Sequence, residues 1–188
     1  MLSHHGKISK VNSFIEFDLA WDEPCAHPII HQDCKIININ HAIFINIASY
    51  FDADSLPQLA AFFYRQADEE KMHAMKFVHY IVEAGGQVRV PAVDEPIYAF
   101  QSAKEAAQAA LNWEEEVTRQ INDLMDLAIK QNDNIGQDFL RWFVSEQLEE
   151  LSTMNTLLST IDRAGENMLW VEDYLARNPI VPEGHEGE

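Results

Sequence analysis

The amino-acid sequence predicts an all-α protein: a four-helix bundle with one long crossover connection, followed by a short fifth helix. Three observations lead to this architecture. Three segments of roughly 30 residues each place apolar residues at helical spacing. About 17 residues separate the first two segments, which is enough chain for two helices to run parallel. Only a few residues separate the last two, so these helices must be antiparallel.

The first helix of the bundle is the least evident in the sequence. Residues 1–29 show neither a helical nor a strand period, and we expect them to form a separate segment ahead of a domain that spans residues 30–177. Between residues 37 and 47, isoleucine stands at every second position except 41, an alternation typical of a β-strand. The same stretch carries a stripe at helical spacing, formed by Ile30, Cys34, Ile37, His41, Phe44 and Ala48. Only the requirement of a four-helix bundle for a fourth long helix favours a helix over a strand in this stretch.

The next helix is expected over residues 55–84. Ser55 can cap its start, Pro57 suits its first turn and Gly85 can end it. At 1.5 Å per residue such a helix is roughly 40–45 Å long, and a connection of about 17 extended residues can reach on the order of 55 Å. The crossover can therefore travel the whole length of the bundle.

Two further long helices are expected over residues 102–131 and 137–164, with the break between them at an Asn-Asp-Asn sequence. A short fifth helix follows over residues 166–177. Residues 178–188 are rich in proline, glycine and acidic side chains, and we expect them to form a disordered tail.

The composition of the chain excludes several classes of protein. The net charge of −18 argues against binding of nucleic acid, whose phosphates attract Lys and Arg, and suits either solubility alone or the attraction of cations. No run of about 18 apolar residues and no signal peptide are recognisable, so we expect a cytoplasmic protein without a membrane partner. Cys25 and Cys34 are too few for a disulfide framework and are expected to be free thiols.

Each of the three well-defined long helices brings a polar side chain into its apolar face near mid-length. Glu70 lies at the centre of the apolar stripe of the second helix, with His73 at its edge. Glu114 lies in the stripe of the third helix, and Gln147 in that of the fourth, with Glu150 one turn further on. A single inward Glu is most often a protonated or paired core residue. Three carboxylates at one level need a common explanation.

The energetics point to a bound cation. An unpaired buried carboxylate costs several kcal/mol, whereas a whole domain is stable by only about 5–15 kcal/mol. No Lys or Arg occupies the inner stripes of these helices near that level. A bound cation is the simplest source of positive charge, and oxygen ligands with one imidazole suit iron or manganese better than zinc. Glu69, Glu146 and Glu149 flank these positions and are either surface acids or ligands of a third, looser ion position.

Four stretches of the sequence resemble the non-haem bacterial ferritins, in particular the actinobacterial type. They read YFDADSLPQLAAFFYRQADEEKMHAMKF, GGQVRVPAVDEP, ALNWEEEVT and FLRWFVSEQLEELSTMNTLLSTIDRAG, and the resemblance covers about residues 47–177. It implies a ferritin-like bundle that assembles as a homo-oligomeric shell of 24 subunits. It further implies that each subunit oxidises Fe(II) with O2 or H2O2 at a dinuclear iron centre and that the shell stores ferric mineral.

The resemblance also assigns roles to the inward residues. Glu70 corresponds to the ligand that bridges the two irons, and His73 to a ligand of the first iron. Glu114 and Glu150 correspond to ligands of the second iron, and Gln147 to the residue that contacts bound oxygen. A third iron position of the family corresponds to Glu69, Glu146 and Glu149. The second Glu-x-x-His motif and the haem-binding methionine of bacterioferritins have no counterpart, so no haem is expected.

One departure from the family concerns the first helix. The family's first-helix glutamate, a ligand of the first iron, falls on Ile37, and its nearby tyrosine falls on Phe44. Asn40 or His41 is the available substitute, although one turn displaces a side chain by roughly 5–6 Å. The leading hypothesis is an iron-storage ferritin with ferroxidase activity. The alternatives are a shell subunit with impaired ferroxidase activity and a di-iron oxygenase or peroxidase, which fits less well because only one Glu-x-x-His motif is present.

Overall fold

The structure of the protein, a computed structural model, describes residues 34–88 and 95–178, with side chains from residue 41 onward. Five helices lie within these ranges: α1 (Cys34–Ala53), α2 (Pro57–Glu83), α3 (Ala103–Lys130), α4 (Asn134–Ala164) and α5 (Met168–Arg177). None of the five is long and apolar enough to cross a membrane. The N-terminal segment, nearly all of the tail, and the side chains of Cys25, Cys34, Ile37 and Asn40 lie outside the described residues.

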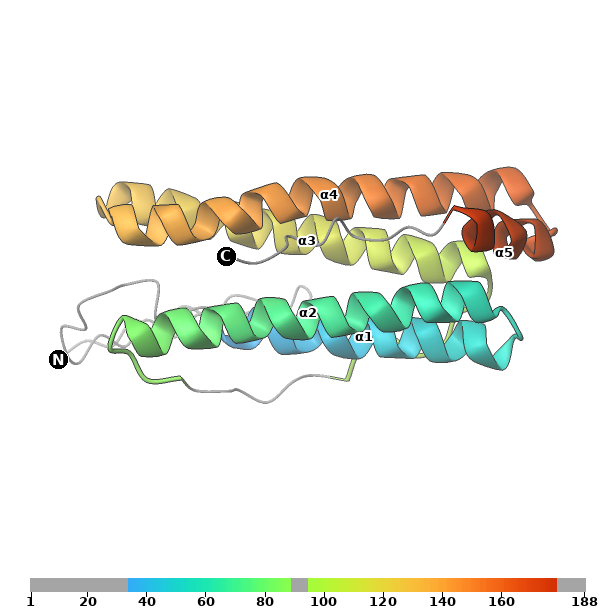
Figure 1. Cartoon of the computed structure of the whole chain (residues 1–188), viewed down its shortest axis with the longest axis horizontal. Helices are drawn as coiled ribbons and strands as arrows, with labels where there is room; N and C mark the ends of the chain where they lie inside the picture. Colours follow the sequence, from blue (N-terminus) through green and yellow to red (C-terminus); the bar gives the residue numbers. More distant parts are fainter. Residues whose placement is uncertain (1–33, 89–94, 179–188) are drawn as a thin grey trace, which may run out of the picture.

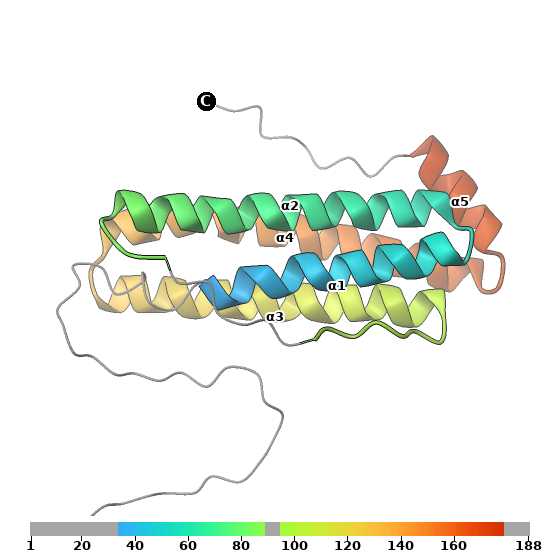
Figure 2. The same cartoon turned by 90° about the horizontal axis from the view of Figure 1, so that it is seen from below.

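The four long helices form the predicted bundle (Figure 1). α1 and α2 lie side by side and antiparallel, as do α3 and α4. α2 ends and α3 begins at opposite ends of the bundle, so the connection between them travels its length and lets α2 and α3 run parallel (Figure 2). α5 packs against α2 and α4 at the end of the bundle where α4 finishes. The all-α fold class and the order of the helices are therefore as the sequence predicts.

The isoleucine-rich segment is helical. From residue 41 onward, the side chains that it buries are Ile43, Phe44, Ile47, Ala48 and Phe51. A strand would have placed Ile45 on the same face as Ile43 and Ile47, but Ile45 is 38% exposed. Burial thus follows the helical period, and packing against the rest of the bundle overrides the strand preference of isoleucine.

The start of α2 differs from the sequence prediction. Ser55 does not cap the helix: it lies in the turn before it with a φ of 60°, and the N-cap position is Leu56, which has no capping side chain. The cap comes from α5 instead. The buried carboxylate of Glu172 accepts hydrogen bonds from the backbone N–H groups of Gln58 (2.7 Å) and Leu59 (2.9 Å). A negative charge is favourable at a helix N-terminus, so Glu172 both caps α2 and holds α5 against it.

The two long helices after the crossover begin at local side-chain caps. The hydroxyl of Ser102 accepts a hydrogen bond from the backbone N–H of Glu105 at 3.1 Å, so α3 begins where the sequence predicts. Asp133 accepts from the backbone N–H of Gly136 at 2.9 Å. Because this cap places Gly136 inside the first turn, α4 begins at Asn134, earlier than the expected residue 137.

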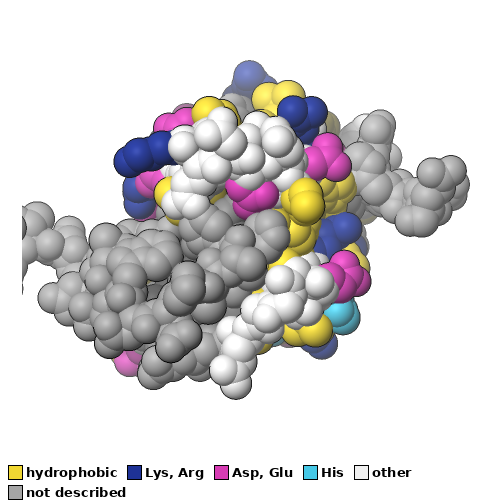
Figure 3. All heavy atoms as spheres, turned by 90° about the vertical axis from the view of Figure 1, so that its left-hand side faces the viewer, with side chains coloured by type: hydrophobic (Ala, Val, Ile, Leu, Met, Phe, Trp, Pro, Cys, Tyr) yellow, Lys and Arg dark blue, Asp and Glu magenta, His cyan; other side chains and the backbone are white. Residues whose placement is uncertain are grey.

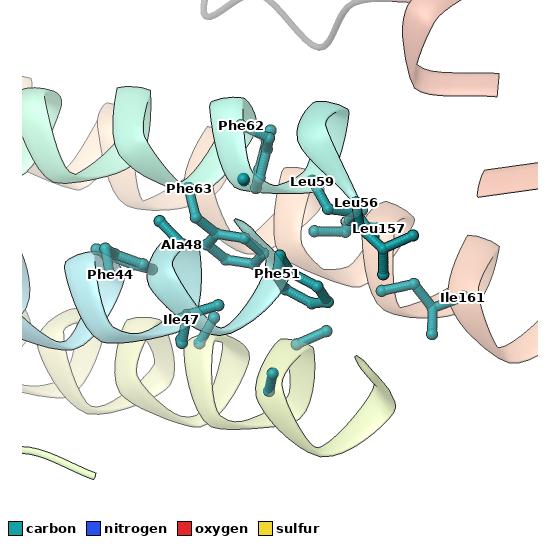
Figure 4. Close-up of a cluster of buried hydrophobic side chains, with 14 of the residues drawn as sticks. Phe44, Ile47, Ala48, Phe51, Leu56, Leu59, Phe62, Phe63, Leu157 and Ile161 are labelled. Carbon is teal, nitrogen blue, oxygen red and sulfur yellow. The ribbon is translucent and has the colours of Figure 1, made fainter. Parts of the chain in front are cut away.

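Two clusters of buried apolar side chains fill the bundle. The larger lies near the α1–α2 turn and α5, where Phe63 stacks on Phe44 and Phe51 with ring centroids 6.1 and 5.5 Å apart (Figure 4). The smaller, toward the opposite end, contains Phe77 and Phe143, whose ring centroids are 4.4 Å apart. The described surface at that end mixes basic, acidic and apolar side chains (Figure 3). Between the two clusters the helices carry a layer of polar side chains.

Replacing Glu172 with Ala should destabilise the protein by about 1–3 kcal/mol, because two backbone N–H groups at the start of α2 lose a charged acceptor. Glu172→Gln keeps one acceptor oxygen, so this variant should lose less stability than Glu172→Ala. Urea denaturation measures the free energy of unfolding, and hydrogen exchange at Gln58 and Leu59 locates the change. The matched control is Asp173→Ala, since exposed Asp173 pairs with Arg177 on the same helix. Equal stability of the two Ala variants would contradict the capping role.

Candidate metal centre

Three helices build the polar layer between the two apolar clusters. α2 supplies Glu70 and His73, α3 supplies Glu114, and α4 supplies Gln147 and Glu150. α2 and α3 run parallel, and α4 runs antiparallel to both. Residues near the middle of the three helices therefore lie at the same level along the bundle. All five side chains are buried, and Glu114 is 0% exposed. The fold therefore buries the five polar side chains that the helical period places in or at the edge of the apolar stripes.

His73 lies between two carboxylates. Its Nδ1 is 3.5 Å from Oε1 of Glu70, and its Nε2 is 3.7 Å from Oε2 of Glu146 on α4. The ring also makes edge contacts with Trp142 and Phe143, with ring centroids 5.3 and 6.0 Å from its own. Aromatic rings thus restrain the plane of the imidazole while both of its nitrogens face acids.

Gln147 connects α3 and α4 across the layer. Its Nε2 donates to Oε2 of Glu114 at 3.3 Å, and its Oε1 accepts from the hydroxyl of Thr118 at 2.7 Å. The same hydroxyl is 2.8 Å from the backbone oxygen of Glu114. Thr118 is not among the residues expected from the sequence, although its place one helical turn after Glu114 is a signal that could have found it. Its hydroxyl orients the amide of Gln147.

Burial favours the protonated forms of Glu114 and Glu150. Burial, and then the charges of Glu70 and Glu150, raise the pKa of Glu114 well above its usual value. Burial and the charge of Glu70 raise the pKa of Glu150 to about 8. Burial lowers the pKa of His73, but hydrogen bonds to Glu146 and Glu70 outweigh it and raise the pKa to about 10. Without metal at neutral pH, these groups therefore keep their protons.

The residues of the layer fit a cation. Oε1 of the fully buried Glu114 has no hydrogen-bond partner, and an unsatisfied buried polar atom costs free energy whether or not it carries a proton. Carboxylate oxygens with one imidazole nitrogen are a ligand set that suits iron or manganese. In the part of the chain that the structure describes, no three His, Cys, Asp or Glu side chains converge at metal-binding distance. A cation would therefore have to draw the carboxylates inward against their mutual repulsion, which its charge can do.

A second group of acids lies beside this layer. Glu69 of α2 and Glu146 and Glu149 of α4 are half-buried. Burial raises the pKa of Glu69, although a hydrogen bond from Gln66 opposes the rise. Gln66, which the sequence expectations do not include, donates that bond from its Nε2 to Oε2 of Glu69. The sequence predicts a third ion position at this second group.

α1 packs against the layer without adding a carboxylate to it. The one acid in the α1 sequence is Asp52, in the last turn. His41 is half-buried, and its Nδ1 donates to the backbone oxygen of Ala67 on α2 at 2.8 Å. Ala67 lies one turn before Glu70, so this bond ties α1 to α2 next to the level of the layer.

Residues 38–164, which span almost the whole bundle, match the family model of the ferritin-like domain. Ferritin BfrB of Mycolicibacterium smegmatis is 42% identical over 134 residues, which covers 71% of this chain and 74% of that protein. The bacterial non-heme ferritin of Staphylococcus aureus is 34% identical over 134 residues, or 69% of this chain and 81% of that protein. The structure of an open pore ferritin from the hyperthermophilic archaeon Archaeoglobus fulgidus aligns with a TM-score of 0.75 at 28% identity, over 79% of this chain and 92% of that one. The chain therefore belongs to the ferritin family, as its sequence motifs predict.

Proposed function

We propose that this protein is an iron-storage ferritin that oxidises Fe(II) at a dinuclear centre in each subunit and holds the ferric product inside a shell. Membership of the ferritin family supports iron storage. The observation that supports the oxidation site is Glu114, whose Oε1 is buried without a hydrogen-bond partner among other acids. A cation at that point would replace the retained proton and give the buried oxygen a partner.

The buried layer offers ligands for two iron ions. We assign Glu70 as the bridging ligand, as the resemblance implies, and its electrostatic effect on both Glu114 and Glu150 is consistent with a position between them. His73 completes the first position, and Glu114 and Glu150 hold the second. Gln147, whose amide crosses the layer, faces the oxidant.

The iron ions are substrate, and the protein binds and positions them. Each Fe(II) gives up one electron, so a pair reduces O2 to hydrogen peroxide, or hydrogen peroxide to water, with protons from solvent. Carboxylates are hard anionic ligands and favour Fe(III) over Fe(II), which assists the oxidation. His73 must release a proton before one of its nitrogens can bind a metal, so iron loading competes with protonation.

A shell subunit with impaired ferroxidase activity is the second candidate, and one observation favours it. The family's first-helix glutamate corresponds to Ile37, and the α1 sequence offers no acid before Asp52. The first iron position then has Glu70 and His73 without a carboxylate from α1. Such a subunit would still build the shell and store iron oxidised elsewhere.

Apolar side chains on the outside of the bundle support assembly into a shell of identical subunits. Met72, Tyr98, Leu148, Leu169 and Trp170 are between 46% and 75% exposed. In a shell of identical subunits, neighbouring subunits would cover such side chains. We propose the homo-oligomer of 24 subunits that the resemblance implies, with the net charge of −18 attracting Fe(II). The absence of haem and the cytoplasmic location stay predictions.

Replacing Glu70 with Ala should slow the fast oxidation of Fe(II) by about tenfold or more without preventing assembly, because the variant lacks the ligand shared by both irons. Fe(II) is added anaerobically, air is admitted, and the near-ultraviolet absorbance of ferric product is followed while light scattering gives the particle size. Glu115→Ala, at an exposed position of α3, is the control and should match the parent. Oxidation at the parent rate by the Glu70 variant would show that the site is wrongly assigned.

Ile37→Glu should bind iron more tightly and oxidise it about tenfold faster than the parent, because it restores a carboxylate where the family has one. Ile37→Gln is the matched control, with similar size and no charge. The same absorbance experiment measures the rate, and anaerobic titration with Fe(II) measures the affinity. If the Glu variant is no faster than the parent, the remaining ligands suffice and the impaired alternative fails.

The metal-free protein should lose stability as the pH rises from about 5 to 9. The folded-state pKa of Glu150 is raised from 4.5 to about 8, so the folded protein binds this proton more tightly than the unfolded chain and stability falls across that window. The folded-state pKa of His73 is raised from 6.5 to about 10, so its stabilising charge is complete below 6.5 and is lost as the pH approaches 10. Both groups therefore lower the free energy of unfolding as the pH rises, by several kcal/mol together.

Urea denaturation in the presence of a chelator, at a series of pH values, measures this dependence. Glu150→Gln should flatten the profile between about pH 5 and 8, because the variant has no proton to lose there. A saturating divalent cation such as Zn²⁺ should stabilise the parent most at high pH, where metal does not compete with protons. Stability that stays constant or rises with pH in the metal-free parent would contradict the assigned protonation states.

A further inference from the structure

The ring of Trp142 lies between two residues of α2. Its centroid is 5.3 Å from that of the His73 imidazole, and the two rings meet edge to face at 76°. Nζ of Lys76 lies over the same indole, 4.1 Å from the ring centroid. Lys76 follows His73 on α2 by three residues, whereas Trp142 belongs to α4. The indole therefore joins a surface lysine to a residue of the buried layer, across the boundary between the two helices.

The orientation of His73 depends on its neighbours. Its two nitrogens are 3.5 and 3.7 Å from carboxylate oxygens of Glu70 and Glu146. An N–H···O hydrogen bond usually measures about 2.7–3.2 Å, so the acids alone hold the imidazole loosely. A histidine that binds metal keeps its orientation through such outer partners. The rings of Trp142 and Phe143, which meet the imidazole at steep angles, therefore contribute to its orientation.

The two supporting rings are held in different ways. Phe143 is buried in the smaller apolar cluster and packs on Phe77. Trp142 is half-buried, so the core encloses less of its indole. An ammonium over the face of an aromatic ring is attracted to its π-electrons, and tryptophan is the strongest such partner. Although the chain has 31 acidic and only 13 basic residues, the ammonium of Lys76 lies over this ring. Lys76 thus adds support for Trp142 from the surface side.

We propose that Lys76 is a positioning residue for the dinuclear centre: its ammonium holds the indole of Trp142 against His73 and so keeps the imidazole in place to bind the first iron. The inference rests on the function proposed above and adds to it a surface residue that acts through Trp142. A positive charge near the centre would by itself repel Fe(II). The positioning role and the bare charge therefore predict opposite changes in iron affinity when the charge of Lys76 is removed.

Anaerobic titration calorimetry of the assembled, full-length protein with Fe(II) tests the proposal. Lys76→Met keeps a similar length without the charge and should weaken Fe(II) binding by about two- to fivefold, the strength of a cation–π contact at an exposed site. Lys76→Arg should bind Fe(II) as the parent does, because a guanidinium also stacks on an indole. Lys71→Met is the matched control: it removes an equal charge from an exposed position of the same helix and should not weaken binding.

Two further measurements show whether Lys76 acts through Trp142. Near-ultraviolet circular dichroism reports how firmly aromatic rings are packed, and the difference between the parent and Trp142→Leu gives the contribution of this ring. Lys76→Met should reduce that contribution, and Lys76→Arg should keep it. In the Trp142→Leu background, Lys76→Met should weaken Fe(II) binding no further, because the ring through which Lys76 acts is absent.

Equal or tighter Fe(II) binding by Lys76→Met would overturn the proposal and leave the proposed function intact. A loss of affinity in Lys76→Arg, or a full further loss from Lys76→Met in the Trp142→Leu background, would overturn it as well. If Trp142→Leu does not assemble, the affinities of Lys76→Met and Lys76→Arg relative to the parent decide. A parent that binds no Fe(II) would overturn the proposed function and this inference together.

Discussion

The structure depends on a group of buried carboxylates that an apolar core cannot accommodate by itself. Glu70, Glu114 and Glu150 come from three different helices and lie between two packed clusters of apolar side chains. Burial and mutual repulsion raise the pKa of Glu114 and Glu150. The positive charge of His73 acts in the opposite direction on Glu150 and so offsets part of the electrostatic cost of burying these carboxylates. A bound cation would replace the retained protons and offset the remaining repulsion, and this is the physical basis of the proposed iron site.

The apolar clusters on either side hold the layer in position. α2 carries Glu70 and His73 and is packed at both ends, by Phe63 in the larger cluster and Phe77 in the smaller one. Its start is further held by Glu172, whose carboxylate binds two backbone N–H groups of α2. α5 thereby contributes to the position of α2 along the bundle, although α5 itself lies far along the chain from the residues that it caps. Rigid support on both sides is what allows repelling groups to stay close together.

The sequence predicts what a single helical period determines and misses what two elements determine jointly. The inward direction of Glu70 follows from its place in an apolar stripe of one helix. The cap of α2 does not follow in this way. Ser55 is the local candidate, but it lies in a left-handed turn. The actual cap, Glu172, accepts a hydrogen bond from the backbone N–H of Gln58, which is 114 residues away in the sequence. Thr118 and Gln66 escape prediction because their roles are hydrogen bonds to the side chains of Gln147 and Glu69, and the apolar period of a helix does not report such bonds.

α1 is the helix about which the sequence says least, in fold and in function. Its isoleucines favour a strand by local preference, and burial of Phe44 and Phe51 in the bundle makes the segment helical. The same helix bears Ile37, where the sequence resemblance implies a carboxylate in the family. The hydrogen bonds that join α3 and α4, from Thr118 through Gln147 to Glu114, do not involve α1. The described residues with which α1 packs into the bundle, such as Phe44 and Phe51, are therefore different from Ile37. If the proposed iron site is correct, a substitution at Ile37 would change oxidation without removing the packing that holds α1 in the bundle.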